Sequence, residues 1–278
     1  MKTIKFDKMH GTGNAYLYVD ARNDTIEAPE ALAVKISDYN FGVGSDGLAL
    51  ILNSEVADFR MRMFNADGSE SAMCGNAARC IGKYVYERNL TNKQEISLET
   101  GSGIKTLQLD VVNGKALKVS VDMDAPRLEA EDIPVNYPDA MNVPIEGMNF
   151  TCVSMGNPHA VTFVDNVAEF DVEAVGKKVE NNPLFPERTN VEFVQIVTPQ
   201  RIGMRVWERG TGETLSCGTG ACATLVAAVM KGKAQRKATI ELLGGELEVE
   251  WNEKTNKVTL TGGAEWVFNG EYRMKSEE

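Results

Sequence analysis

Histidine is nearly absent from this sequence, and cysteine is sparse. The 278 residues contain two histidines, His10 and His159, and five cysteines. No Cys-x-x-Cys pair occurs, which argues against a structural zinc site. The odd number of cysteines and the lack of an export signal favour free thiols in a reducing cytoplasm. No metal-ligand cluster and no recognisable pyridoxal-phosphate lysine motif is present, so we expect the protein to use neither cofactor.

Basic residues are fewer than acidic ones, and long apolar runs are missing. There are 29 lysines and arginines against 40 aspartates and glutamates, giving a net charge of −11. That charge argues against nucleic acid and anionic membranes as partners. No apolar run reaches the roughly 18 residues that span a bilayer. With 43% apolar residues, the chain is expected to form one large or two ordinary packed domains.

What the sequence does contain is a segment that occurs twice. Its first copy includes Cys74-Gly-Asn and its second includes Cys217-Gly-Thr. In each, a polar glycine-rich loop leads through Cys-Gly into an apolar helical run. The offset from position 74 to position 217 also relates other pairs of residues: Gly13-Asn14 and Gly156-Asn157, Gly47 and Asn190, Asn65 and Glu208, Glu70 and Glu213, Gly101 and Gly244. A constant offset without gaps indicates an internal duplication into two related domains.

Each half is expected to have the same plan of strands and one central helix. In the first half we expect a loop at 10–14, a helix that includes 31–36 and a central helix at about 76–88. The strands of this half are expected at 2–7, 15–20, 47–52, 58–65, 95–99, 104–110 and 116–122. In the second half we expect a helix at 218–230 and strands near 150–153, 160–164, 191–197, 202–208, 238–242, 246–251 and 257–261. The second helix is apolar on all sides, which predicts a buried helix with a sheet wrapped around it.

The fold class is therefore α/β, with two pseudo-symmetric domains, each a mixed, mostly antiparallel sheet rolled around a central helix. We place the N-terminal domain at 1–120 plus 264–278, because the last residues are expected to complete its sheet. The C-terminal domain is placed at 121–263, with the active site in the cleft between the two. The proline-rich, acidic stretch 122–144 is typical of a linker.

The two cysteines suggest a paired acid and base. A cysteine at a helix N-terminus lies where free N–H groups and the helix dipole favour its thiolate and lower its pKa. If the two loops face each other, the N–H groups after each cysteine can bind a substrate carboxylate. One thiolate then removes the α-proton from one face, and the other thiol protonates the opposite face. This chemistry is racemisation.

Six motifs make the chain resemble the diaminopimelate epimerase family, whose members work without pyridoxal phosphate. They are His10-Gly-Thr-Gly-Asn14, Asn65-Ala-Asp-Gly-Ser69, Cys74-Gly-Asn76, Met155-Gly-Asn-Pro-His159, Arg188-Thr-Asn-Val-Glu192 and the run from Glu208 to Cys222. The motifs extend over nearly the whole chain. The resemblance implies a cytoplasmic homodimer that interconverts LL- and meso-diaminopimelate, a small amino-acid substrate, in lysine and peptidoglycan precursor biosynthesis.

The resemblance also implies roles for individual residues. Cys74 and Cys217 would be the acid and base, and His159 and Glu208 would tune their pKa values. The carboxylate at the reacting end would be held by Gly75, Asn76, Gly218 and Thr219. The distal amino-carboxylate end would be bound by Asn14, Asn65, Asn157, Asn190, Glu208 and Arg209.

Three positions depart from the family pattern: Ala15, Gly47 and Ala77. Some members have a substrate-contacting glutamine in place of Gly47. An alternative function is racemisation of proline, hydroxyproline or histidine by the same fold, and a non-catalytic binding protein is a third possibility. A redox pair is the competing hypothesis for the two thiols. Cys80, Cys152 and Cys222 are expected in the core. The sequence leaves open which cysteine acts on which stereoisomer.

Overall fold

The computed structural model describes residues 3–274, and these form two compact units. Unit 1 comprises Met1–Val121 together with Gly262–Glu278, and unit 2 comprises Asp122–Thr261. Unit 2 is therefore continuous in sequence, whereas unit 1 is built from both ends of the chain. Among the described residues no helix is long and apolar enough to cross a membrane.

Within the described residues 3–274, unit 1 contains two helices and nine strands. Its helices are α1 (Pro29–Ser37) and α2 (Gly75–Glu87). Its strands are β1 (Thr3–Gly11), β2 (Asn14–Asp20), β3 (Gly47–Leu52), β4 (Phe59–Asn65), β5 (Glu70–Ser71), β6 (Glu95–Thr100), β7 (Gly103–Val112), β8 (Lys115–Asp122) and β18 (Glu265–Arg273).

Unit 2 also contains two helices, α3 (Val172–Glu180) and α4 (Gly218–Met230). Its strands are β9 (Val143–Ile145), β10 (Met148–Ser154), β11 (Pro158–Phe163), β12 (Asn190–Thr198), β13 (Arg201–Glu208), β14 (Gly212–Thr214), β15 (Lys237–Leu242), β16 (Gly245–Trp251) and β17 (Val258–Gly262). Both of its helices begin at the offset from their unit 1 counterparts that the sequence repeat predicts.

The two units share one strand topology. In unit 1, β2 pairs in parallel with β3, β3 is antiparallel to β4, and β4 is parallel to β6. Unit 2 repeats this order with β11, β12, β13 and β15. Most other pairings are antiparallel hairpins. The mixed, mostly antiparallel α/β fold is the one that the sequence predicts.

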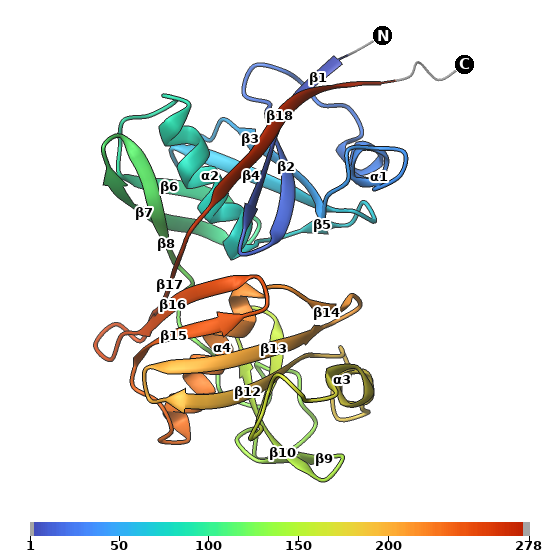
Figure 1. The fold of residues 1–278 in the computed structure, drawn as a ribbon, viewed down its shortest axis with the longest axis vertical. Helices are drawn as coiled ribbons and strands as arrows, with labels where there is room; N and C mark the ends of the chain where they lie inside the picture. Colours follow the sequence, from blue (N-terminus) through green and yellow to red (C-terminus); the bar gives the residue numbers. More distant parts are fainter. Residues whose placement is uncertain (1–2, 275–278) are drawn as a thin grey trace. The chain divides into compact units, whose positions relative to one another are not determined.

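A central helix lies against the sheet in each unit. In unit 2, α4 contacts β10 to β13 and also β15 and β16, and it lies behind β12, β13 and β15 in Figure 1. Residues 220–228 of α4 are all buried, as expected for a helix that is apolar on all sides. In unit 1, α2 contacts β1, β2 and β7. It buries two charged side chains, and of these Lys83 donates to the Ala116 carbonyl oxygen at 2.9 Å.

A second helix covers another part of each sheet. Leu32 and Ile36 of α1 pack with Leu17 and Leu48 of β2 and β3. In unit 2 the helix α3 contributes to the core cluster formed with β12. The strands β3 and β12 therefore begin with continuous buried runs rather than an alternating pattern, as expected for strands that are covered on both faces.

The C-terminal strand returns to unit 1. β18 runs antiparallel to β1, from the pair Thr3 and Arg273 to the pair His10 and Glu265, and Figure 1 shows it beside β1 and β2. Phe6 and Phe268 form an edge-to-face ring contact at 5.9 Å. The Trp266 ring nitrogen donates to Glu87 of α2 at 2.9 Å. The two ends of the chain thus close one sheet.

Two expectations about loops are corrected by the structure. His10 and Gly11 belong to β1, so the turn is reduced to Thr12 and Gly13, both of which have positive φ. The stretch 122–144 belongs to unit 2 and contributes buried residues to it, rather than forming a linker. Its buried residues include Met123, Ile133, Val135, Ala140 and Val143. These apolar side chains lie between the prolines and acids that suggested a linker.

Candidate functional site

Cys74 and Cys217 occupy the same position in their units. Each is the residue immediately before the central helix, with extended backbone at φ −140° and −122°. Cys217 is 6% exposed, and Cys74 is partly exposed. The first residues of the helices are Gly75-Asn76 and Gly218-Thr219, whose N–H groups have no partner within the helix. Both cysteines therefore lie beside potential anion-binding donors.

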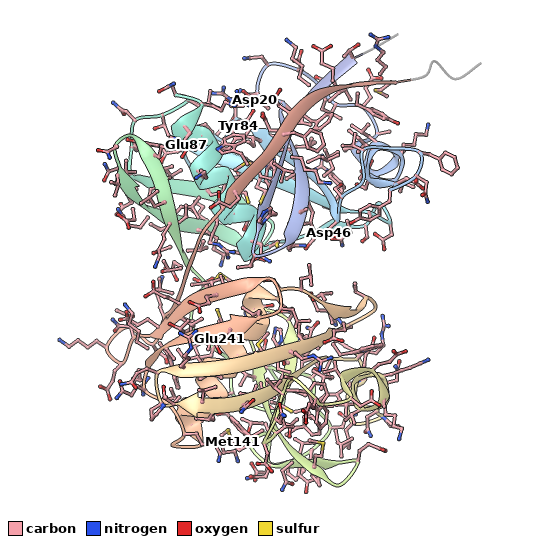
Figure 2. The ribbon with its side chains drawn as sticks, viewed as in Figure 1. Asp20, Asp46, Tyr84, Glu87, Met141 and Glu241 are labelled. Carbon is pink, nitrogen blue, oxygen red and sulfur yellow. The ribbon has the colours of Figure 1, made fainter. Side chains whose placement is uncertain are left out.

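In unit 1, Cys74 lies in a network centred on Asn14. The Cys74 sulfur donates to Asn14 Oδ1 at 3.6 Å, and Asn76 Nδ2 donates to the same oxygen at 3.3 Å. Asn14 Nδ2 donates to Asp46 Oδ2 at 3.0 Å, and the Ala15 N–H donates to that oxygen at 2.7 Å. Asp46 immediately precedes β3 and is labelled in Figure 2. Because a carboxylate can only accept, it fixes the orientation of the Asn14 amide.

The network continues to a buried arginine. Arg79 is 0% exposed, and its Nη2 donates to Asn76 Oδ1 at 2.9 Å. Its Nε donates to the Gly263 carbonyl oxygen at 3.3 Å, which links α2 to the start of the C-terminal segment. Asn65 accepts from the Tyr16 hydroxyl at 3.3 Å. The structure thus brings Cys74, Asn14 and Asn76 together, and it places Asn65 in a separate group with Tyr16 and Ser69.

In unit 2, the Cys217 sulfur has two hydrogen-bond contacts at the start of α4. The Gly220 N–H donates to it at 3.4 Å, and the Thr219 hydroxyl lies 3.5 Å away. Asn157 Nδ2 donates to Thr219 Oγ1 at 3.3 Å. Asn157 Oδ1 in turn lies 3.0 Å from His159 Nε2. Cys217, Thr219, Asn157 and His159 are therefore one connected group, as Cys74, Asn76 and Asn14 are in unit 1.

His159 is bound on its other side by a buried acid. Its Nδ1 lies 2.6 Å from Glu192 Oε1, and both residues are 0% exposed. Glu192 lies close to the first turn of α4, because a Cβ at Gly220 would be 2.7 Å from its Oε1. The glycine therefore makes room for the carboxyl group.

The pKa of the Cys217 thiol is raised well above its ordinary value. Burial is the largest cause, followed by the nearby carboxyl groups of Glu208 and Glu192. The donors from Thr219 and Gly220 act in the opposite direction but are weaker. The expectation that the helix N-terminus lowers this pKa is wrong for Cys217, because desolvation of the thiolate outweighs the dipole.

Glu208 lies near Cys217 at the end of β13. It accepts a short hydrogen bond from the Thr214 hydroxyl. Burial raises the pKa of Glu208, while hydrogen bonds from Thr214 and Cys217 and the nearby His159 lower it. A carboxyl group beside a buried thiol favours the protonated sulfur.

Asn190 and Arg209 form a second pair in unit 2. Asn190 Oδ1 accepts from the Arg209 N–H at 2.9 Å, and its Nδ2 donates to the Pro158 carbonyl oxygen at 2.9 Å. The Arg209 guanidinium donates to the Glu187 carbonyl oxygen at 3.0 Å. Its side chain is only partly buried, so its remaining N–H donors are available for a ligand carboxylate.

Gly47 lies at the start of β3, where there is no room for a side chain. A Cβ there would lie 2.1 Å from the Phe64 carbonyl oxygen and 2.6 Å from the Tyr16 ring. A glutamine therefore does not fit this position beside Tyr16. Ala77 is completely buried in α2.

The other three cysteines lie in the core, as the sequence predicts. Cys80, Cys152 and Cys222 are all 0% exposed. Burial raises the pKa of Cys80 to about 11, and it raises the pKa of Cys152 still further. The Cys80 and Cys152 thiols are therefore protonated at neutral pH, which suits packing rather than catalysis.

Three residues of the networks were missed in the sequence: Asp46, Arg79 and Glu192. A signal for Glu192 was available, since it is an acid within the otherwise apolar run that begins β12. Arg79 is likewise a charge in a helix that was expected to lie at the centre of its domain. Neither pattern predicts the hydrogen-bond partners of these side chains, because partners such as His159 and Gly263 are distant in sequence.

Other features of the described residues do not coincide with these networks. Two surface hollows of about 350 and 380 Å³ lie in unit 1, and neither is lined by a residue of the cysteine networks. Within residues 3–274, no group of three or more His, Cys, Asp or Glu side chains is arranged to hold a metal ion.

Comparison with known proteins gives one family. The family model described as diaminopimelate epimerase matches residues 6–129 and again residues 151–267. A protein of Acetivibrio thermocellus named diaminopimelate epimerase is 57% identical over 274 residues, covering 96% of this chain and 98% of that protein. A protein of the same name from Methanococcus maripaludis is 56% identical, with 96% and 99% covered. One from Phocaeicola vulgatus is 54% identical, with 98% and 99% covered.

Solved structures with the same fold are more distant. A phenazine biosynthesis protein of the PhzF family from Bacillus anthracis has a TM-score of 0.73 at 20% identity, covering 99% of this chain and all of that one. A hydroxyproline epimerase from Agrobacterium vitis has a TM-score of 0.72 at 13% identity, with 98% and 91% covered. At these identities the likeness shows the fold alone.

Proposed function

Because this chain belongs to the diaminopimelate epimerase family, we propose that it is an isomerase that converts LL-2,6-diaminopimelate to meso-diaminopimelate. The relatives that are more than half identical support the substrate, since they match over nearly the whole chain. The conversion would serve lysine and peptidoglycan precursor biosynthesis. The observation that supports the mechanism best is the equivalent placement of Cys74 and Cys217 before the two central helices.

In this proposal each cysteine acts on one face of the same α-carbon. The substrate carboxylate is held by the N–H groups at the start of α2 and α4, from Gly75, Asn76, Gly218 and Thr219. Negative charge that develops on the carboxylate is stabilised by these donors. The thiolate removes the α-proton, and the opposite thiol supplies a proton to the other face, so no external acid or base and no cofactor is needed.

The resting protonation state follows from the surroundings of Cys217. Its raised pKa keeps it a thiol at neutral pH, so we assign Cys217 the acid role in the free enzyme. During protonation of the substrate, the Cys217 thiolate is stabilised by the Gly220 N–H and the Thr219 hydroxyl. In the reverse reaction the two roles exchange.

The distal end of the substrate carries a second amino group and a second carboxylate. We propose that Arg209 binds this carboxylate and that Glu208 attracts the ammonium group, assisted by Asn14, Asn65, Asn157 and Asn190. The available donors of Arg209 favour a doubly charged substrate over proline or hydroxyproline, which lack a distal carboxylate. Lysine, which also lacks it, should be a very poor substrate.

Replacing each cysteine tests the two-thiol mechanism. Cys74→Ala and Cys217→Ala should each abolish epimerisation of LL-diaminopimelate, and the double variant should be little worse, because neither thiol can do the other's step. Stereo-resolved chromatography in deuterated water measures inversion and isotope uptake, and Cys80→Ala is the matched control. Full inversion by either single site variant would refute the mechanism.

A substrate panel separates the proposed activity from the alternatives. LL-diaminopimelate, lysine, proline and hydroxyproline are compared at equal concentration, and only the first should turn over rapidly. Faster turnover of proline or hydroxyproline would support the alternative racemase. Failure of every amino acid in the panel would support a non-catalytic binding protein.

We also propose, from the family resemblance, that the protein is a cytoplasmic homodimer. Sedimentation equilibrium gives the oligomeric state directly. A mass of one chain over the whole concentration range would rule the homodimer out.

A further inference from the structure

A chain of hydrogen bonds in unit 2 leads from a buried acid to the catalytic sulfur. Glu192 Oε1 lies 2.6 Å from His159 Nδ1, and His159 Nε2 lies 3.0 Å from Asn157 Oδ1. Asn157 Nδ2 donates to Thr219 Oγ1 at 3.3 Å, and that hydroxyl lies 3.5 Å from the Cys217 sulfur. The far end, Glu192, does not itself hydrogen-bond to Cys217.

The direction of each bond in this chain follows from its neighbours. Asn157 presents its oxygen to His159, so His159 Nε2 must be the donor and must hold a proton. One proton then remains to be shared between His159 Nδ1 and the Glu192 carboxyl group. Wherever it lies, the pair has no net charge, which is the condition under which two fully buried ionisable groups are tolerated.

The direction of the Thr219 O–H bond also follows from its neighbours. Because its oxygen accepts from Asn157 Nδ2, its own hydrogen can turn to the Cys217 sulfur. The sulfur then has two donors, the Thr219 O–H and the Gly220 N–H at 3.4 Å. Two donors stabilise the thiolate that forms when Cys217 gives up its proton.

The equivalent network in unit 1 has the opposite polarity. There Asn14 donates its amide hydrogen to Asp46 and presents its oxygen to the Cys74 sulfur. The Cys74 sulfur therefore donates to this amide oxygen, whereas the Cys217 sulfur accepts from the Gly220 N–H and contacts the Thr219 hydroxyl. The sequence repeat places Ala49 opposite Glu192, so the directing acid of unit 2 has no counterpart at that position in unit 1.

We propose that Glu192 is a positioning residue for Cys217, which orients the Thr219 hydroxyl toward the sulfur through His159 and Asn157. Its significance for catalysis rests on the proposed function, but the orientation itself does not. The Glu192 carboxyl group packs closely against the start of α4 and needs a glycine there, since a Cβ at Gly220 would lie 2.7 Å from its Oε1. Glu208, from β13, is the other acid that faces Cys217.

Glu192→Gln can reverse the direction of the hydrogen bonds between residue 192 and Thr219. It does so without changing the net charge of the pair that residue 192 forms with His159. A glutamine amide that donates to His159 Nδ1 keeps the direction of these hydrogen bonds. A glutamine carbonyl that accepts instead from a neutral His159 protonated on Nδ1 makes Nε2 an acceptor. Asn157 turns over to donate to Nε2, and Thr219 donates to Asn157 Oδ1 instead of to sulfur. Cys217 loses one donor. Thr219→Val removes the same donor directly.

The test is the pH dependence of Cys217 alkylation by iodoacetamide, in a Cys74→Ala background and with the modified residue identified by mass spectrometry. Glu192→Gln and Thr219→Val should each raise the midpoint by roughly one pH unit, the loss expected for one hydrogen bond to a charged sulfur. The double variant should shift no further than either single one, because both remove the same bond. Glu250→Gln, a partly exposed acid of β16, is the matched control and should not shift it.

Two outcomes would overturn the proposal. A downward shift in Glu192→Gln would mean that the charge of Glu192 acts directly on the sulfur. An unchanged midpoint in Thr219→Val, or additive shifts in the double variant, would mean that Glu192 does not act on the sulfur through Thr219. Thermal denaturation checks that each variant is folded. If Glu192→Gln does not fold, Thr219→Val still tests whether the Thr219 hydroxyl donates to the Cys217 sulfur. Since no substrate is used, failure here is distinguishable from failure of the proposed function.

Discussion

At the scale of single residues, two asparagines that the sequence repeat pairs with each other are oriented in opposite ways. Asn14 is held by Asp46 and offers its oxygen to Cys74. Asn157 accepts from His159 and offers its hydrogen to Thr219. Each cysteine has thereby been given a different set of neighbours around the same backbone. A reaction in which one thiol must be an acid while the other is a base requires such a difference.

The buried thiols make a prediction about stability in alkaline solution. The pKa of Cys80 is raised to about 11, and those of Cys152 and Cys217 are also raised. Above pH ~8.5 a thiol in the unfolded chain loses its proton while the folded one retains it. The unfolded state then binds fewer protons, so the free energy of unfolding falls as pH rises.

Urea denaturation at pH 8 and pH 10.5 measures this effect. Each buried thiol should contribute a loss of up to about 1.4 kcal/mol per pH unit above its unfolded pKa. Cys80→Ala should remove one such contribution and flatten the dependence, whatever it does to the stability at pH 8. An identical slope in wild type and variant would show that the Cys80 thiol ionises as easily in the fold as outside it.

At the scale of elements, β3 and its neighbours decide what fits at Gly47. The strand lies between β2 and β4, and a Cβ at Gly47 would meet the Phe64 carbonyl oxygen at 2.1 Å. A backbone oxygen in a sheet cannot move without breaking strand pairing. Close approach of this kind is a recognised reason for glycine inside a strand.

Gly47→Ala should therefore destabilise the protein by about 1–3 kcal/mol or more, as overpacking does. The matched control is Gly203→Ala in β13, where the nearest atom to a Cβ is a valine methyl group at 3.2 Å, a flexible side-chain end. Urea midpoints of the two variants measure the difference. Equal effects would show that the backbone near Gly47 yields more readily than the structure indicates.

At the scale of the whole molecule, the two units differ in how the chain builds them. Unit 2 is one continuous segment, whereas unit 1 needs β18 from the other end of the chain. Without β18, the edge of β1 and the rings of Phe6 and Tyr84 lose their partners, Phe268 and Trp266. An unpaired strand edge and exposed rings favour aggregation.

We predict that a fragment of residues 122–261 folds cooperatively alone, while a fragment of residues 1–121 does not. Adding a synthetic peptide of residues 262–278 should restore a cooperative urea transition to the second fragment. Circular dichroism and two-dimensional NMR of each fragment provide the readout. A folded 1–121 fragment without the peptide would show that β18 contributes little to unit 1.

Much of this architecture was determined by sequence alone. The duplicated Cys-Gly segment predicts two equivalent helices, and these begin at Gly75 and Gly218. The apolar run after Cys217 predicts a buried helix, and the apolar pattern predicts that three of the five cysteines lie in the core. Such features depend on local periodicity and helix-capping position, which neighbouring residues determine.

Only the tertiary structure decided the properties of the site residues. The pKa of Cys217 is raised rather than lowered because burial and two carboxyl groups, 9 and 25 positions away in the chain, outweigh the helix dipole. Asp46 fixes the Asn14 amide and Glu192 binds His159, although no sequence pattern joins either pair. Desolvation and hydrogen-bond direction depend on which distant strands the fold places side by side, so they are properties of the packed chain.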